Sequence, residues 1–232
     1  MIGIVVPAHN EEAHIAASVA DLRMAARHPA LRGEPVEVLF VLDSCSDATG
    51  PIALSLGVRT LTVSARNVGH ARAAGAQVLL DEGARWLAFT DADTRVSPDW
   101  LVRQLELHAD AVCGSIGVDD WSLHGDLAES LRAHFACTYT DADNHRHIHG
   151  ANLGVSAAAY VRAGGFPALA CSEDVALVEA LQATGARIAW SAAPRVSTSA
   201  RVDARARGGF GDTLLAVIAA GFGVSALPQL AE

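Results

Sequence analysis

The chain has 232 residues, of which 51% are hydrophobic, so it is long enough to bury the core of one large domain or of two closely packed halves. Its formal net charge of −9 and its lack of a long basic run exclude nonspecific nucleic-acid binding. The four cysteines show no Cys-x-x-Cys spacing, which favours reduced thiols in a cytoplasmic protein over a zinc site or a disulfide framework.

Neither end of the sequence predicts a membrane segment. The apolar run that begins at Met1 has no basic residues before it and ends at Pro7, so it is read as a strand and not as a signal peptide. The longest apolar stretch, 213–227, contains two glycines and is shorter than the roughly 18 residues of a membrane span. We expect a core helix or a subunit-interface helix there, which leaves a homodimer open.

Apolar runs that alternate with helical patterns predict an α/β fold. Apolar runs at 2–7, 35–42 and 86–89 are typical of parallel strands covered on both faces, and residues 58–63 look like a further short strand. Residues 13–27 predict the first helix, with Asn10 as its N-cap and two glutamates in its first turn. The alternation predicts right-handed βαβ crossovers and a mostly parallel sheet flanked by helices.

Polar residues follow each predicted strand, at the edge where open α/β sheets bind ligands. Asp43 ends the second strand, and Asp91 and Asp93 follow the fourth, before a Ser-Pro-Asp helix start. Two carboxylates one residue apart offer the hard oxygen ligands that suit Mg²⁺ or Mn²⁺, which would hold a diphosphate. The alternative for these two acids alone is a solvated turn with an Asx cap.

Seven short motifs occur in one order along most of the chain. They are residues 5–12, 43–49, 66–72, 91–93, 150–154, 164–166 and 172–174. With these motifs the chain resembles a family 2 glycosyltransferase of the GT-A fold. The resemblance implies a single Rossmann-like GT-A domain over residues 1–232. Its nucleotide-sugar-binding half would be 1–112, and its acceptor-binding and catalytic half would be 113–232.

The resemblance also implies where the nucleotide binds. Asp43 would accept hydrogen bonds from the base or ribose, and Arg66 would lie near the base and phosphates, unless it is an ordinary cation at a helix start. Leu42 stands where the family commonly has the first of two acids, so the base stays open, with UDP favoured slightly over GDP. Four residues at the end of the first strand would border the nucleotide: Pro7, Ala8, Asn10 and Glu12.

For the metal, the resemblance implies that Asp93 ligates the ion directly, while Asp91 meets the ribose or a metal-bound water. Several relatives add a late histidine ligand, but the last histidine here is His149, so diphosphate and water would supply most other ligands. Arg201 could neutralise phosphate. Residues 205–209 predict either a flap over the diphosphate or solvated surface charge.

The segment Ser172-Glu173-Asp174 begins a predicted helix over 175–184. From the residues alone, Ser172 is its cap and the acids face the helix dipole. The resemblance instead implies that Asp174 takes the proton of the acceptor hydroxyl in an inverting reaction, and that Glu173 holds the loop or a sugar hydroxyl. No nucleophile for a covalent intermediate is evident, although retaining enzymes share similar folds.

The second half of the sequence predicts an amphipathic helix over 127–139 and a helix over 156–163 that ends at two glycines. Between them, His145, His147 and His149 would share one side of an extended segment. They could bind a transition metal, line the acceptor pocket or lie in a solvated loop.

Together these features predict a metal-dependent glycosyltransferase that moves a sugar from a nucleotide-diphosphate donor to an unidentified acceptor hydroxyl. Two alternatives stay open: a catalytically silent nucleotide- or sugar-binding module, and a sugar-phosphate nucleotidyltransferase. The latter usually has a Gly-rich basic loop after its first strand, which residues 7–11 do not resemble. A dinucleotide-dependent dehydrogenase lacks support because no G-x-G-x-x-G follows that strand.

Overall fold

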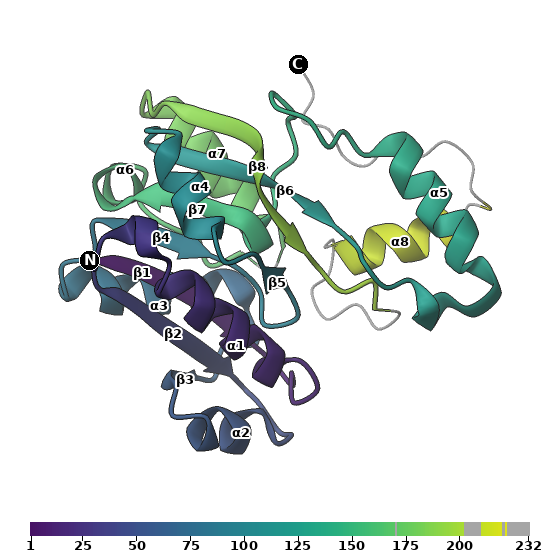
Figure 1. Cartoon of the computed structure of the whole chain (residues 1–232), viewed down its shortest axis with the longest axis horizontal. Coiled ribbons are helices and arrows are strands. Elements are labelled where there is room, and N and C mark those ends of the chain that lie inside the picture. Colours follow the sequence, from purple (N-terminus) through teal and green to yellow (C-terminus); the bar gives the residue numbers. More distant parts are fainter. Residues whose placement is uncertain (170, 202–209, 220, 222–232) are drawn as a thin grey trace.

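A computed structural model describes residues 1–169, 171–201, 210–219 and 221 (Figure 1). Its strands are β1 (Ile2–Ala8), β2 (Val36–Asp43), β3 (Arg59–Val63), β4 (Trp86–Phe89), β5 (Arg95–Val96), β6 (Ala111–Gly117), β7 (Leu153–Ser156) and β8 (Ile188–Ser197). Its α-helices are α1 (Ile15–Ala26), α2 (Thr49–Ser55), α3 (Val68–Asp81), α4 (Trp100–Glu106), α5 (Ala128–Thr138), α6 (Ala157–Arg162), α7 (Glu173–Ala183) and α8 (Phe210–Ala219). Three short 3₁₀ helices are η1 (Pro29–Leu31), η2 (Ser122–Leu127) and η3 (Gly150–Asn152).

All the strands join one mixed sheet in the order β3-β2-β1-β4-β7-β6-β8-β5. The pairs β3·β2, β2·β1 and β1·β4 are parallel, as is β6·β8. The strand β7 runs antiparallel between β4 and β6, and β5 pairs antiparallel with β8. The mostly parallel α/β architecture is confirmed. Because β1, β2 and β4 are parallel neighbours, their carboxyl ends lie together at one edge.

The glycines of β6 and β7 have neighbours packed directly over them. A Cβ at Gly114 would lie 2.2 Å from Nδ2 of Asn152, and one at Gly154 would lie 2.4 Å from Oε1 of Gln104. These strands need small residues at those positions, which interrupts the apolar runs that reveal β1, β2 and β4. The sequence prediction therefore lacks β6 and β7, and it also lacks β5 and β8, which contain no glycine.

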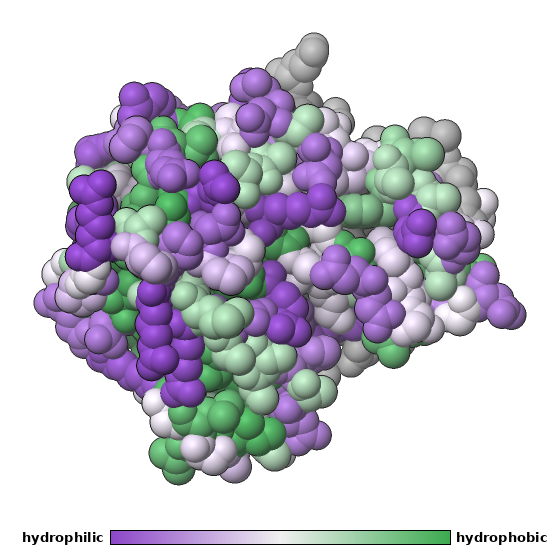
Figure 2. Space-filling view, in the orientation of Figure 1, coloured by the Kyte–Doolittle hydropathy of each residue, from purple (hydrophilic) through white to green (hydrophobic). Residues whose placement is uncertain are grey.

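Hydrophobic side chains form two large clusters and a third, smaller one. The third cluster joins α5 to α8, where Leu131 packs with Leu214 and Val217, and Figure 1 shows these helices as a lobe beside the sheet. The predicted apolar helix is therefore α8, while positions 220 and 222–227 of that stretch lie outside the described residues. In the view of Figure 2, hydrophobic surface gathers over α2, where Leu54 is exposed.

One predicted helix cap is wrong, and a second is correct in position but lacks the capping hydrogen bond. The N-cap of α1 is His14, and Asn10 instead has a φ of 56° and binds another loop with its side chain. The first turn of α1 contains no acid. Ser172 does occupy the N-cap position of α7, but its φ of 57° leaves its side chain without a capping hydrogen bond. A search of the described residues finds no helix with the length and hydropathy of a membrane span.

Candidate active site

The loops after β1 and β2 are tied together by side chains that bind backbone amides. Asn10 Oδ1 accepts from the amides of Ser46 and Asp47 at 2.8 and 3.3 Å. Glu12 Oε2 accepts from the amide of Ala48 at 2.9 Å, and the Glu12 amide donates to Asp47 at 3.1 Å. These reciprocal bonds fix the shape of the edge that the sequence analysis assigned to the nucleotide.

Asp43 organises the next loop. Its Oδ1 accepts from the amides of Ala65 and Arg66, and its Oδ2 accepts from the amide of Asn67, all within 2.9 Å. Burial alone would raise the pKa of the Asp43 carboxyl, but these amide donors hold that pKa below its ordinary value. The structure thus places Asp43 beneath the loop that presents the exposed side chain of Arg66.

Pro7 and Ala8, the other two residues predicted to border the nucleotide, end β1. Ala8 is buried and its carbonyl accepts from Cys45 Sγ at 3.3 Å, while Pro7 is half-buried. Both lie where the β1 and β2 loops meet, so their backbone forms part of that edge.

Arg201 joins two acids of this edge. Its guanidinium donates to both carboxylate oxygens of Glu11 at 2.9 and 2.7 Å and lies 2.7 Å from Oδ2 of Asp93. Burial raises the pKa of Asp93 to about 6; Arg201 opposes this shift, and the neighbouring acids Asp91 and Glu11 add to it. Glu11 was not singled out from the sequence, where it looked like a first-turn glutamate.

Arg72 joins two further acids. Its guanidinium, almost fully buried, pairs with Glu173 and with Oδ1 of Asp91 at 2.5 Å, and it lies 5.7 Å from the centre of the Phe166 ring. Burial raises the pKa of Glu173, and the positive charge of Arg72 opposes that shift. Arg72 appeared in a sequence motif without a role, and the structure makes it the bridge between the Asp91 loop and the start of α7.

Asp174 is held by the loop before β7. Its Oδ2 accepts from the amide of Gly150 at 2.7 Å, and its Oδ1 accepts from the amide of Val175 at 2.9 Å. A Cβ at Gly150 would lie 2.4 Å from Nη1 of Arg72. Glycine is therefore required where this loop passes between the guanidinium and Asp174.

The three histidines stack and do not converge on a metal. Tyr139 and His147 are parallel at 4.1 Å between ring centres, and His145 and His149 extend the column. Burial lowers the pKa of all three histidines, that of His149 to about 3, so the rings are neutral at neutral pH. The amides of Thr140 and His147 donate to ring nitrogens of this column. The rings stack face to face, and no metal-binding group of three such side chains occurs within the part of the chain that the structure describes, so the transition-metal alternative is wrong.

Asp91 and Asp93 each pair with an arginine at this edge. One oxygen of each carboxylate contacts an arginine, and the other oxygen of Asp93 accepts from the hydroxyl of Thr94 at 3.5 Å and keeps a lone pair for a ligand. Within the described ranges, no three His, Cys, Asp or Glu side chains converge as a metal site. A cation at this pair would take its remaining ligands from the bound substrate and water.

The sequence of the chain matches a known enzyme family. The family model described as Glycosyl transferase family 2 matches residues 3–162, which is more than half of the chain. The chain belongs to this family. The match includes the Asp43, Asp91 and Gly150 segments and ends before Asp174. A comparison with curated proteins finds no match for this family 2 member.

Solved structures share its fold at low identity. S. aureus TarS 1-349 with UDP-GlcNAc has a TM-score of 0.65 at 16% identity over 90% of this chain and 61% of that chain. The mannosyltransferase PcManGT from Pyrobaculum calidifontis with GDP-Man and Mn²⁺ has a TM-score of 0.61 at 18% identity, over 91% and 59%. The M. tuberculosis glucosyl-3-phosphoglycerate synthase with Mg²⁺ and UDP has a TM-score of 0.59 at 19% identity, over 97% and 80%.

The family 2 member thus spans about three fifths of the length of TarS 1-349 and PcManGT. Its sheet matches these glycosyltransferase structures of the GT-A fold, as the sequence predicted.

Proposed function

We propose that the chain transfers a sugar from a nucleotide-diphosphate donor to an acceptor hydroxyl. Family membership supports this reaction class, and one observation carries the assignment of the site. Arg72 holds Asp91, on the loop proposed to bind the donor, and Glu173, next to the proposed base. One buried cation thereby fixes the two halves of the reaction relative to each other.

The nucleotide would lie over the loops after β1 and β2. Asn10 and Glu12 act there through the backbone amides that they fix, and Asp43 holds the loop from which the exposed Arg66 reaches the base or phosphates. We favour UDP slightly over GDP. A family match alone leaves the base open, since TarS is seen with UDP-GlcNAc and PcManGT with GDP-Man.

Asp93, assisted by Asp91, would hold Mg²⁺ or Mn²⁺. Such a cation supplies Lewis-acid neutralisation of the diphosphate leaving group. Arg201 contacts Asp93 and Glu11, and its positive charge is placed to neutralise part of the charge of the diphosphate as well. Structures of two similar folds contain Mn²⁺ and Mg²⁺ with nucleotide, which supports this choice of ion.

Asp174 would act as the base in an inverting displacement. The acceptor oxygen forms its bond to the anomeric carbon as the bond from that carbon to the diphosphate oxygen breaks, and the hydroxyl proton passes to Asp174. The amide of Gly150 orients the carboxylate, and Glu173 keeps the loop in place through Arg72. The division at residue 112, a cytoplasmic location and a homodimer stay predictions.

Thermal unfolding with UDP or GDP, each with and without Mn²⁺, tests the donor site. A ligand at 100 times its Kd stabilises by about 2.7 kcal/mol, which raises the Tm by roughly 5–10 °C in a domain of this size. We expect this shift with metal, and its loss in Asp93→Asn. The matched control is Asp81→Asn, because Asp81 is an exposed acid that binds Gln77 on α3. No shift from either nucleotide would refute the donor site.

Catalysis is tested separately. We expect metal-dependent hydrolysis of a UDP-sugar by the purified chain, and Asp174→Asn should lose hydrolysis while keeping the nucleotide shift. Nucleotide binding without any turnover would favour the silent binding module. Retention of configuration at the transferred carbon would rule out the role of Asp174 as an inverting base.

A further inference from the structure

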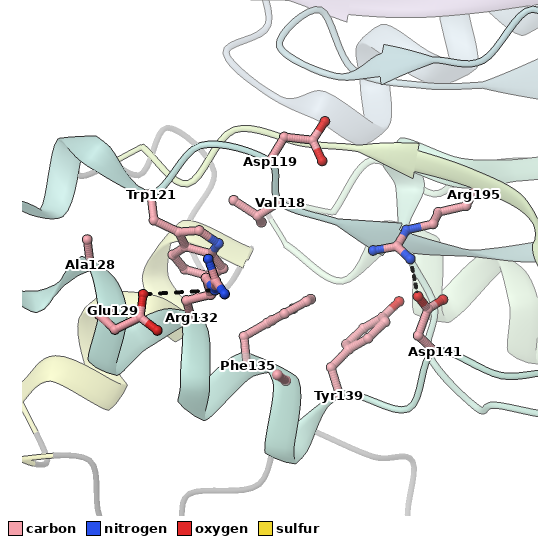
Figure 3. Close-up of a pocket in the computed structure, with 11 residues that line it drawn as sticks. Val118, Asp119, Trp121, Ala128, Glu129, Arg132, Phe135, Tyr139, Asp141 and Arg195 are labelled. Carbon is pink, nitrogen blue, oxygen red and sulfur yellow. Dashed lines mark hydrogen bonds and ion pairs between the residues drawn. The ribbon is translucent and has the colours of Figure 1, made fainter.

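A cavity of about 620 Å³ lies in the second half of the chain, within the size range of small-molecule sites. It is formed by the loop after β6, one face of α5 and the end of β8 (Figure 3). The acidic cluster of the candidate active site does not line this cavity, so the cavity would bind a different molecule from the nucleotide-sugar donor.

One wall of the cavity is aromatic. The rings of Trp121 and Phe135 are 5.7 Å apart between centres, and those of Phe135 and Tyr139 are nearly parallel at 4.7 Å. Figure 3 shows the three side chains directed into the same space, with Arg195 across from them. Because Phe135 and His147 cover the two faces of the Tyr139 ring, Tyr139 offers its edge, and the half-buried ring of Phe135 offers the apolar surface against which the C–H face of a sugar can pack.

The charged groups of the cavity are largely paired with one another. Arg195 pairs with Asp141, and Arg132 lies 3.9 Å from Glu129. With Asp119, the lining contains three carboxylates and two guanidiniums, a formal charge of −1. Carboxylates accept hydrogen bonds from hydroxyl groups, whereas a phosphate group would meet like charges and already paired arginines.

Two chains of contacts connect the cavity to the candidate active site. On one side, Tyr139 Oη accepts from the amide of Ile116 and contacts His149 Nε2 at 3.1 Å. The next residue, Gly150, binds Asp174 at 2.7 Å. The inner wall of the cavity and the proposed base are therefore held by adjacent residues of one loop.

On the other side, the amide of Thr198 donates to the carbonyl of Gly117, the residue before the cavity lining. The hydroxyl of Thr198 contacts that of Thr94 at 3.0 Å, next to Asp93. The cavity thus adjoins both the segment of the proposed base and that of the proposed metal ligand.

We propose that this cavity binds the acceptor and that the acceptor is an uncharged carbohydrate. The aromatic wall would hold a sugar face, and the rim carboxylates would accept from its hydroxyls. A phosphorylated or carboxylated acceptor would bind poorly. The acceptor role rests on the proposed glycosyl transfer, whereas sugar binding in the cavity can be measured without it.

The test uses saturation-transfer NMR on the full chain. The probes are methyl glycosides of glucose, galactose, mannose and N-acetylglucosamine, cellobiose, and glucose 6-phosphate as the charged counterpart. Ala136→Trp fills the cavity from an exposed lining position of α5, whereas Ala133→Trp adds the same side chain at an exposed position of α5 outside the lining.

We expect at least one neutral probe to bind, and Ala136→Trp to weaken it by at least about tenfold while Ala133→Trp does not. Glucose 6-phosphate should bind more weakly than methyl glucoside. Failure of every neutral probe to bind, equal binding by both variants, or tighter binding of the phosphate would each overturn the proposal.

UDP and Mn²⁺ shifts are measured in the same samples, and both variants should keep them. Sugar binding without any nucleotide shift would mean that the proposed transfer fails while the carbohydrate site stands. A nucleotide shift with unchanged sugar binding in Ala136→Trp would mean that the nucleotide site stands while the proposed carbohydrate site fails.

Discussion

Replacing Arg72 with methionine should destabilise the fold more than any surface charge substitution. The change removes the guanidinium between Asp91 and Glu173 and keeps a side chain of similar width. Glu173 is only 4% exposed, so it would become a buried carboxylate without the cation that it contacts. Removing one partner of a buried pair costs about 3–5 kcal/mol, which we expect at pH 8.

The loss should depend on pH. The pKa of Glu173 is raised from its ordinary 4.5, because burial outweighs the attraction of Arg72. A group whose pKa is raised on folding makes its full contribution to the free energy of unfolding at pH values below its unfolded pKa. That contribution is lost as the pH rises through its folded pKa. Removing Arg72 raises the folded pKa further. The variant should therefore be less destabilised at pH 5 than at pH 8.

Urea denaturation followed by circular dichroism at both pH values measures the effect. The double variant Arg72→Met with Glu173→Gln should recover part of the loss at pH 8, since it removes the buried charge. The control is Arg59→Met, whose partner Glu82 is exposed, so its stability should stay close to wild type. Equal losses in the two single variants, or a loss independent of pH, would refute the reasoning.

Three further outcomes are expected. Because the pKa of Asp93 is raised to about 6, its carboxylate gains a proton as the pH falls from 7 to 5, so stabilisation by UDP and Mn²⁺ should fade over that range in thermal unfolding. The pKa of His149 is lowered from 6.5 to about 3, so stability should fall below pH 6.5, and His149→Asn should flatten that decline in a Tm series. Gly150→Ala should cost about 1–3 kcal/mol in urea denaturation because its Cβ meets a buried guanidinium. Its control, Gly50→Ala in α2, has room for a Cβ and should be neutral or gain up to about 1 kcal/mol.

The sequence predicts the parallel half of the sheet well, because a strand buried on both faces reads as a continuous apolar run. That signal holds for β1, β2 and β4. It fails for β6 and β7, whose glycines are dictated by Asn152 and Gln104 packed above them. Those contacts come from distant parts of the chain, so no local pattern could reveal them.

For the site, the strand-end argument brings Asp43, Asp91 and Asp93 to one edge, as the structure has them. The same argument does not predict the arginines that pair with Asp91 and Asp93. Arg72 stands among small residues in α3, and a charge on such a face is the signal that could have marked it as buried. Glu11 carries no comparable signal, since its partner Arg201 is far away in sequence.

Arg201 and Glu11 are 190 positions apart in the chain. Contacts of this separation close a very long loop and are typical of late steps in folding. During synthesis the N-terminal strands emerge first, so the carboxylates of Glu11 and Asp93 stay hydrated and mutually repelling until the segment after β8 brings Arg201 to them. Closure of this edge by Arg201 would then be among the last events of folding, and the candidate active-site edge would be the last part of the described structure in which these charges are neutralised.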